Sequence, residues 1–345
     1  MRVVVVGASG NVGTAVLRRL AAEPAVTTIV GVARRPPTGS GHPYDAASWE
    51  SVDVGAGDAV PKLTAALTGA DAVIALAWRL QPSWDRAALE RVNVGGTRAV
   101  VDAALAAGVP RLVYASSIGA YAPSPGDQRR DERWPTTGIS TSTYSRQKAA
   151  VERMLDDLDP ARLAVLRVRP GIVLQPAAAA EIARLFLGPL VPTSLLRPSL
   201  LPVLPWPRGM RGQIVHADDL ADAVVRGLLA GTTGGLNVAT EPALTRPLLA
   251  EVLDARPFGV PPRVVRALAA GTWRAHLQPT EPGWLDMAMQ APVMDTGRAR
   301  GLGWAPARPA GDVLRDFLAA LAAGRGDASP ALAPRTRMFG RRATG

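Results

Sequence analysis

Short β-branched runs alternate with helical patterns through the first 170 residues of this chain. Such runs are typical of strands buried on both faces, and the patterns between them are typical of amphipathic helices. The alternation predicts an α/β fold of the Rossmann-like, doubly wound kind, in which helices cover both faces of a parallel sheet. We expect strands at Val3–Val6, Thr28–Val32, Ala72–Leu76, Arg111–Ala115 and Leu163–Val168, and helices at about 11–22, 83–107 and 142–158.

The composition shifts near Pro170, and residues 177–212 are rich in proline and in apolar side chains. No single regular element accommodates so many prolines, so we interpret this segment as a lid or a pocket wall, with a surface linker as the alternative. The remainder to about Ala323 is expected to be mostly helical. Within it we predict strands at Gln213–His216 and Leu236–Val238, and a helix at Leu220–Leu229 capped by Asp218 or Asp219.

A glycine turn, Gly7-Ala-Ser-Gly10-Asn-Val-Gly13, follows the first expected strand and opens the first expected helix. At such a junction, glycines allow a tight turn and a close backbone approach to a diphosphate, and the helix N-terminus faces the anion. This placement predicts a bound dinucleotide. We therefore expect a dinucleotide-binding domain over 1–170 with 213–240 returning to it, a smaller substrate-binding region over 171–212 and 241–323, and a basic, flexible tail over 324–345.

Tyr144 and Lys148 form the most informative pair of side chains, because the chain has only two lysines and four tyrosines. On a helix, positions i and i+4 lie on one face. An ammonium group beside a phenol favours the phenolate, so the pair predicts a tyrosine with a lowered pKa that acts as a general acid–base. An exposed tyrosine–lysine pair on a helix surface is the alternative for this pair taken alone.

Composition narrows the remaining possibilities. The absence of cysteine excludes disulfides, thiolate metal sites and a cysteine nucleophile. The three histidines are far apart in the sequence, so we predict no metal site and a structural role for His216. The net charge of +10 comes from scattered arginines and a basic end, and we expect no specific nucleic-acid partner. No run of 18 apolar residues exists and the N-terminal apolar run is too short for a signal peptide, so we expect no membrane span and a cytoplasmic location.

The chain resembles the extended short-chain dehydrogenase/reductase family, also called the NAD-dependent epimerase/dehydratase family. The resemblance covers about residues 1–320 and depends on six motifs that occur in the family's order and approximate spacing. These are the glycine turn Gly7–Gly13, Asp53-Val54, Asn93-Val-Gly-Gly-Thr97, Ala115-Ser116-Ser117, Tyr144–Lys148 and Arg169-Pro170-Gly171.

The resemblance implies a role for each of these residues. Tyr144 would exchange a proton with a substrate oxygen, Ser117 would hydrogen-bond the same oxygen, and Lys148 would hold the nicotinamide ribose. The catalytic set is then Ser117, Tyr144, Lys148 and Asn93. The cofactor would contact Gly7, Ser9, Gly10, Asn11, Val12, Gly13, Arg34, Arg35, Asp53, Val54, Ala75, Ala77, Asn93, Tyr144, Lys148 and Pro170, and the substrate would contact Trp78, Arg79, Gln81 and Ser117.

The residues after the second strand bear on the choice of cofactor. Enzymes that use NAD usually carry an acid there for the ribose 2′-hydroxyl. Here the strand is followed by Arg34 and Arg35, and the next acid is Asp45. Two guanidinium groups suit a 2′-phosphate, so we predict a preference for NADP, with NAD as the alternative.

Two departures from the family pattern bear on the reaction. The 4,6-dehydratases typically carry Asp-Glu after the catalytic residue, where this chain has Ile118-Gly119. Sugar-nucleotide enzymes commonly carry an asparagine at the position of Ile172. With the apolar segment 177–212, these departures predict an NADP-dependent ketoreductase or alcohol dehydrogenase that acts on a moderately apolar small molecule.

Two other functions stay open from the sequence. One is an NAD-dependent sugar-nucleotide epimerase, and the other is a non-catalytic protein that senses dinucleotides. The resemblance also implies a homodimer formed through the two long helices at about 83–107 and 142–158.

Overall fold

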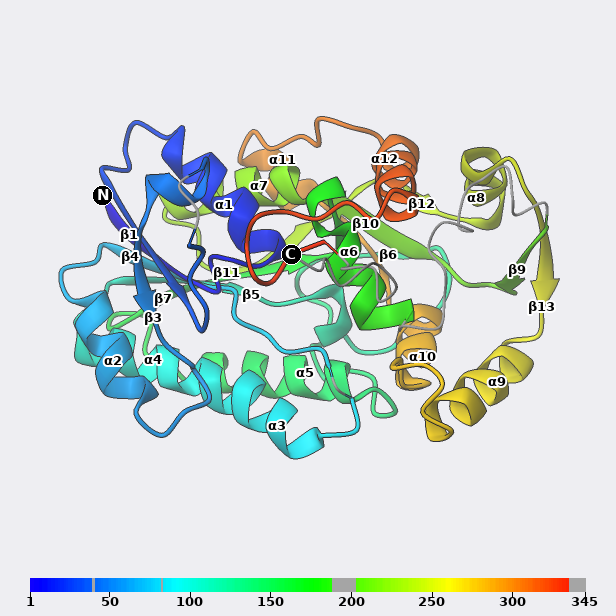
Figure 1. Cartoon of the computed structure of the whole chain (residues 1–345), viewed down its shortest axis with the longest axis horizontal. Coiled ribbons are helices and arrows are strands. Elements are labelled where there is room, and N and C mark those ends of the chain that lie inside the picture. Colours follow the sequence, from blue (N-terminus) through cyan, green and yellow to red (C-terminus); the bar gives the residue numbers. More distant parts are fainter. Residues whose placement is uncertain (39–40, 82, 188–202, 335–345) are drawn as a thin grey trace, which may run out of the picture.

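A seven-stranded parallel sheet forms the centre of the molecule in the computed structural model, which describes residues 1–38, 41–81, 83–187 and 203–334 (Figure 1). Its strand order is β11-β7-β5-β4-β1-β2-β3. The predicted Rossmann-like α/β fold is therefore confirmed. The strands are β1 (Arg2–Val6), β2 (Thr28–Ala33), β3 (Ser48–Ser51), β4 (Ala72–Ala75), β5 (Arg111–Ala115), β7 (Ala164–Pro170) and β11 (Gly234–Val238).

Helices cover both faces of this sheet, and two apolar cores result. In one core, α1 (Asn11–Ala21) and α7 (Ala217–Leu229) pack against the sheet together with the buried Trp304. In the other, α2 (Ala59–Leu67), α4 (Gly96–Ala106) and α5 (Thr143–Asp156) pack on the opposite face. The side chains of β1 alternate between the two cores, with Val3 and Val5 in the first and Val4 and Val6 in the second.

The smaller region at the right of Figure 1 is built from the later part of the chain. A three-stranded sheet has the order β12-β10-β8, and two two-stranded pairs join β13 with β9 and β14 with β6. Its elements are β6 (Arg129–Arg130), β8 (Ile172–Leu174), α6 (Ala179–Ile182), β9 (Val203–Pro207), β10 (Gly212–His216), β12 (Thr240–Leu244), α8 (Arg246–Leu253), β13 (Arg256–Val260), α9 (Pro262–Arg274), α10 (Gly283–Gln290), β14 (Val293–Met294) and α12 (Ala310–Ala322). By contrast, α11 (Gly297–Gly301) packs against β11 of the central sheet.

Three details differ from the sequence prediction. The helix expected at 83–107 is divided into α3 (Arg86–Glu90), a π-helical turn (Arg91–Gly95) and α4. The helix expected from Leu220 begins at Ala217, and its cap is His216, whose Nδ1 accepts the Asp218 N–H at 3.2 Å. The part beyond residue 240, expected to be mostly helical, also contributes β12, β13 and β14.

The segment 177–212 also proves to be divided. Its first part forms α6 and a π-helical turn over Ala183–Leu187, and its last part forms β9. Residues 188–202 lie outside the described part of the chain.

Candidate active site

The glycine turn lies at the carboxyl end of β1, where the strand order reverses between β1 and β4. Gly7 has φ +92°, and a Cβ on it would lie 2.7 Å from the backbone nitrogen of Ala77. A Cβ on Gly13 would lie 2.3 Å from the carbonyl oxygen of Gly7. Only glycine fits these two positions, so the turn leaves the backbone exposed to a ligand at the switch point of the sheet.

Two connected cavities open on this turn. The Arg34 cavity has a volume of about 520 Å³ and extends over the ends of β1, β2 and β3. The Tyr144 cavity has a volume of about 550 Å³ and extends over the ends of β5 and β7. Both are lined by Gly7, Gly10, Leu76, Trp78, Leu80, Glu181 and Leu185, so they form one continuous cleft.

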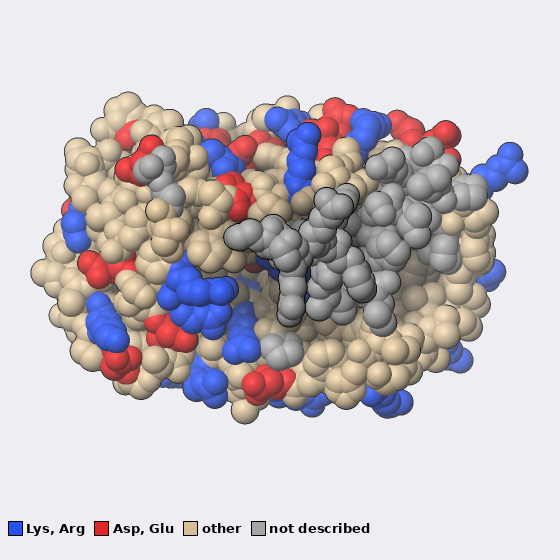
Figure 2. All heavy atoms as spheres, in the orientation of Figure 1, with Lys and Arg blue, Asp and Glu red and all other residues tan. Residues whose placement is uncertain are grey.

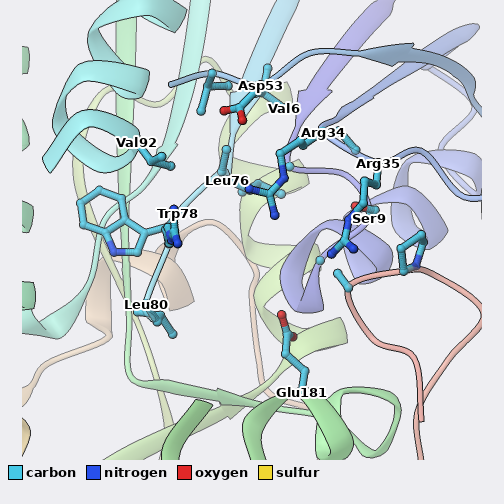
Figure 3. A pocket seen from close by; sticks show the side chains of 18 of the residues that line it. Val6, Ser9, Arg34, Arg35, Asp53, Leu76, Trp78, Leu80, Val92 and Glu181 are labelled. Carbon is cyan, nitrogen blue, oxygen red and sulfur yellow. The ribbon is translucent and has the colours of Figure 1, made fainter. Parts of the chain in front are cut away.

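The structure places most predicted cofactor residues on this cleft. Gly7, Ser9, Gly10, Arg34, Arg35, Asp53, Val54 and Ala77 line the Arg34 cavity, and Asn11, Val12, Gly13, Tyr144, Lys148 and Pro170 line the Tyr144 cavity. Ala75 lines neither cavity, because it is paired within β4 and its side chain packs in a core. Figure 3 shows Arg34 and Arg35 on one side of the Arg34 cavity and Glu181 pointing into it from another.

Helix α5 positions the catalytic candidates. Ser142 caps it by accepting the Ser145 N–H at 3.3 Å, and Tyr144 and Lys148 then lie one turn apart. Burial raises the pKa of Tyr144 to about 12, and a hydrogen bond with Ser117 acts in the opposite direction. The lowered tyrosine pKa expected from the sequence is therefore wrong, because desolvation of the phenol dominates.

Lys148 lies deeper in the site than the sequence suggested. Its ammonium group donates to the Ala115 carbonyl oxygen at 2.6 Å and lies 3.5 Å from the centre of the Trp78 ring. Burial lowers the pKa of Lys148 well below its usual value, although the charge of Glu152 opposes this shift. The lysine is thus held by a carbonyl and an aromatic face, 5.8 Å from the centre of the Tyr144 ring.

Glu152 lies beneath the site and was not among the residues predicted from the sequence. It lies on α5 one turn beyond Lys148, is fully buried, and accepts from Arg169 at 2.9 Å through both of its oxygens. It also accepts a hydrogen bond from Ser116, the neighbour of Ser117. The i+8 spacing from Tyr144 could have indicated it, since successive turns of one helix face then carry functional groups.

Asn93 hydrogen-bonds the backbone of the loop that follows β4, on the side of this loop away from the cleft. Its Oδ1 accepts the Arg79 N–H at 2.7 Å, and its Nδ2 donates to the Arg79 carbonyl and to Gln147. Asn93 lines neither cavity, so the prediction that it faces the cofactor is not matched by the geometry.

The residues predicted to contact substrate separate into two groups. Ser117 lines the Tyr144 cavity, and its Oγ accepts the Gly119 N–H at 3.0 Å. Trp78 lines both cavities, whereas Arg79 and Gln81 line the Arg34 cavity alone. Gln81 donates to the Leu185 carbonyl at 2.9 Å, which ties this loop to the turn after α6.

Aromatic side chains from distant segments enclose Tyr144. The Trp284 ring, from α10, lies 4.7 Å from the Tyr144 ring, and Phe186 packs edge-on against Trp284 at 5.0 Å. Ile118, Ile182, Leu185 and Met287 complete this wall of the Tyr144 cavity. Neither Trp284 nor Met287 was predicted from the sequence, because no local pattern places α10 beside α5.

The last described residues also lie on the cleft. The tail was expected to be flexible from residue 324, but Ser329 and Leu332 are fully buried, and Pro330, Ala331 and Ala333 line the Arg34 cavity. Residues 335–345, with the arginines of the basic end, lie outside the described part of the chain.

The described residues lack two features, a membrane-spanning helix and a metal-binding cluster. They contain no helix that is long and apolar enough to cross a membrane. The same described residues contain no cluster of three or more histidine or acidic side chains that could bind a metal ion. On the face drawn in Figure 2, basic and acidic side chains are interspersed among the described residues.

Several known proteins are similar to this chain in sequence. Three uncharacterized mycobacterial proteins, from Mycobacterium bovis and two strains of Mycobacterium tuberculosis, are 29% identical over 330 residues. These matches cover 93% of this chain but only 30% of each mycobacterial protein. L-arabinose 1-dehydrogenase (NAD(P)(+)) from Haloferax volcanii is 39% identical over 120 residues, which is 34% of this chain and 41% of that protein.

A solved structure shows the same fold at low sequence identity. The UDP-glucose 4-epimerase of Thermus thermophilus, in complex with NAD, has a TM-score of 0.68 and 21% identity. The match covers 93% of this chain and 99% of that one. A family model, described as the NAD dependent epimerase/dehydratase family, matches residues 3–239. With the glycine turn and the Tyr144–Lys148 pair lying on one cleft, the chain belongs to the NAD dependent epimerase/dehydratase family.

Proposed function

We propose that this protein is an NADP-dependent oxidoreductase of the ketoreductase or alcohol dehydrogenase type, acting on a moderately apolar carbonyl or alcohol. The observation that carries the proposal is the lining of the Tyr144 cavity, where Trp284, Phe186 and Met287 enclose the Tyr144 side chain. A sugar diphosphate would bring many polar groups against this wall, and each would lose hydration without a partner.

The cleft fits a dinucleotide in its backbone and in its charge. The Gly7 and Gly13 positions leave no room for a side chain, so the turn admits a diphosphate close to the N-terminus of α1. Arg34 and Arg35 are exposed, and neither forms an ion pair with any described residue. Both guanidinium groups can therefore pair with a 2′-phosphate, which supports NADP. When bound, the nicotinamide supplies or accepts the hydride.

The side chains of this protein handle the proton. In carbonyl reduction the Tyr144 hydroxyl donates its proton to the carbonyl oxygen as the carbonyl carbon gains the hydride. The Ser117 hydroxyl lies beside Tyr144 and would donate a hydrogen bond to the same oxygen, which stabilises the developing negative charge. A tyrosine with a pKa of about 12 is protonated at neutral pH, which suits a proton donor. Lys148, from one turn away, would contact the nicotinamide ribose.

The substitution Tyr144→Phe tests this assignment. We expect the variant to bind NADPH as the wild type does and to lose at least about 100-fold in kcat for carbonyl reduction, because the proton donor is absent. The measurement is NADPH oxidation with a panel of aromatic and aliphatic ketones and aldehydes. Unchanged turnover in the variant would refute the role of Tyr144.

A second candidate, an epimerase that holds NAD tightly, is favoured by the fold it shares with the Thermus UDP-glucose 4-epimerase. Freshly purified protein would then release stoichiometric NAD when it is denatured. An empty site that binds NADPH more tightly than NADH supports the reductase.

A further inference from the structure

The described end of the chain folds into a compact turn after α12. Ala180 donates its N–H to the Arg325 carbonyl at 2.9 Å, and the Asp327 N–H donates to the Leu332 carbonyl at 2.9 Å. Leu332 in turn donates to the Ser329 carbonyl at 3.1 Å. A Cβ on Gly326 would lie 2.4 Å from the Leu332 carbonyl oxygen, so the turn closes tightly on a glycine. We call residues 326–334 the C-terminal strap.

Two sets of hydrogen bonds attach the strap to the cleft. The Ser329 hydroxyl, fully buried, donates to the carbonyl oxygen of Ser9 in the glycine turn at 2.6 Å. The Arg184 guanidinium, from the turn after α6, donates to the carbonyl oxygens of Ala331 and Ala333, each at 2.6 Å. The strap therefore bridges the glycine turn and the α6 side of the cleft, two segments that are far apart in the sequence.

The bridge covers the cavity that Arg34 and Arg35 line. Pro330, Ala331 and Ala333 line it with apolar surface, and the C-terminal ribbon runs past Ser9 in Figure 3. A ligand held against the glycine turn and reaching Arg34 would lie beneath the strap.

We propose that the C-terminal strap is the outer wall of the nucleotide site and that a bound dinucleotide leaves only when the Ser329–Ser9 and Arg184 contacts open. The inference rests on the proposed function only in that it takes a nicotinamide dinucleotide as the ligand of this cleft. The strap would then set how fast the protein exchanges oxidised for reduced cofactor, the property that separates a reductase from an enzyme with retained NAD.

Dissociation rates of NADPH, followed by its fluorescence after rapid mixing with excess NADP, test the proposal without any substrate. A chain truncated after Arg325 lacks the strap, and a chain truncated after Pro334 keeps it but lacks the basic end. We expect the first truncation to raise the dissociation rate by about tenfold or more, since affinity changes within one site fall mostly on dissociation. The second truncation is the matched control and should dissociate NADPH at the wild-type rate.

Point variants of the full chain cover the case in which the shorter chain does not fold. Ser329→Ala removes the bond to Ser9, and Arg184→Met removes the bonds to the two strap carbonyls. Each should raise the dissociation rate by several-fold, and the double variant should raise it further. An unchanged dissociation rate in the double variant would overturn the proposal, as would faster association with unchanged dissociation, because the strap would then be an obstruction in front of the site.

The test is independent of turnover. If the wild type binds NADPH but reduces no carbonyl, the proposed reaction fails while the strap proposal is still decided by the dissociation rates.

Discussion

Glu181 is the acidic residue that lines both cavities in the described part of the chain. Burial raises the pKa of its carboxyl group to about 7, against the opposing charge of Arg184. A diphosphate at the glycine turn would share the cleft with this group. Since two anions in one partly desolvated cleft repel each other, the binding of a dinucleotide favours the protonated form of Glu181.

The pH dependence of cofactor affinity follows from this preference for protonated Glu181. With a pKa of about 7, Glu181 is mostly protonated in mild acid and becomes charged as the pH rises, so its ionisation should weaken NADPH binding above neutrality. Glu181→Gln keeps the shape of the side chain and should remove the weakening of NADPH binding that ionisation of Glu181 causes. The variant should bind NADPH more tightly than the wild type about one pH unit above that pKa and nearly equally about one unit below it.

Titration of NADPH against both proteins at a series of pH values measures the effect. The ratio of the two dissociation constants isolates Glu181, since ionisation of the 2′-phosphate affects both proteins alike. A ratio that stays constant with pH would show that Glu181 does not face the bound dinucleotide.

The Tyr144–Lys148 spacing predicted that the two side chains share the cleft, but it did not predict the direction in which the pKa of Tyr144 is shifted. Helix periodicity fixes that the two side chains lie on one face, and it holds wherever the helix lies in the protein. The direction of the Tyr144 pKa depends on desolvation by Trp78 and Trp284, which come from other segments. A local motif therefore identified the residues on the cleft and assigned the tyrosine pKa the wrong direction.

At the scale of elements, a buried ion pair joins α5 to β7 beneath the site. Burial acts to raise the pKa of Glu152, but hydrogen bonds and charges from Arg169, with Ser116 and Arg167, outweigh it and hold that pKa below its usual value. Arg169 also donates to Tyr121 at 3.0 Å, which in turn donates to Asn237 on β11 at 2.6 Å. The network connects the helix that carries Tyr144 to two neighbouring strands of the sheet.

Removal of the Glu152 charge should therefore be costly. We expect Glu152→Gln to lower the free energy of unfolding by about 3–5 kcal/mol, because Arg169 would be left buried without its counter-charge. Asp156→Asn is the matched control. Asp156 lies on the same face of α5 as Glu152 and pairs with Arg167, but it is exposed, so its substitution should lower the free energy of unfolding by about 1 kcal/mol or less.

Chemical denaturation of both variants measures the difference, and its pH dependence gives a second check. Because the folded-state pKa of Glu152 is lowered, its contribution is present above the unfolded-state pKa and is lost as the pH falls through the folded-state value. The difference in free energy of unfolding between the wild type and Glu152→Gln should therefore become smaller at acidic pH. Equal stability of the two variants at neutral pH would refute a stabilising pair.

The elements themselves followed from the sequence where periodicity was long and regular. β1, β5, α1 and α5 lie within one or two residues of their predicted bounds. The π-helical turn at Arg91–Gly95 was missed, because it places Asn93 against the Arg79 loop through contacts that are remote in sequence. The cap of α7 was assigned to an aspartate by propensity, whereas the side chain that accepts the Asp218 N–H is His216.

At the scale of the whole molecule, the sequence predicted the sheet and one wall of the cleft, since Phe186 lies in the segment 177–212 that was interpreted as a lid or pocket wall and it lines the Tyr144 cavity. The strand–helix alternation constrains topology, because parallel strands require crossovers that cover both faces. The other walls come from Trp284 and the C-terminal strap, which meet the cleft only after the chain has folded. Their sequences carry no motif, and the strap lies in a segment whose composition indicated flexibility.

The homodimer expected through the segments 83–107 and 142–158 stays a prediction, and the exposed faces of α4 and α5 within them determine its properties. On α4 the exposed side chains include Arg98 and Asp102, and on α5 they include Arg146 and Arg153. A two-fold axis brings the same patch of both subunits together, so the arginines of α5 would face one another across the interface. Such a dimer should be weak at low salt and strengthen as salt screens the repulsion.

Sedimentation velocity at low and high ionic strength tests this expectation. Because both subunits carry the substitution, Arg153→Glu leaves Arg146 and one glutamate on each α5 face, so the net repulsion across the interface falls and the protein should shift toward dimer at low salt. Arg308→Glu is the control, because Arg308 lies in the loop before α12 and outside these faces. A dimer that is stable at low salt and unaffected by Arg153→Glu would show that the interface lies on another surface. In a symmetric contact through α5, every charge on this helix face occurs in both subunits, so a substitution there changes the electrostatic energy of the interface twice over.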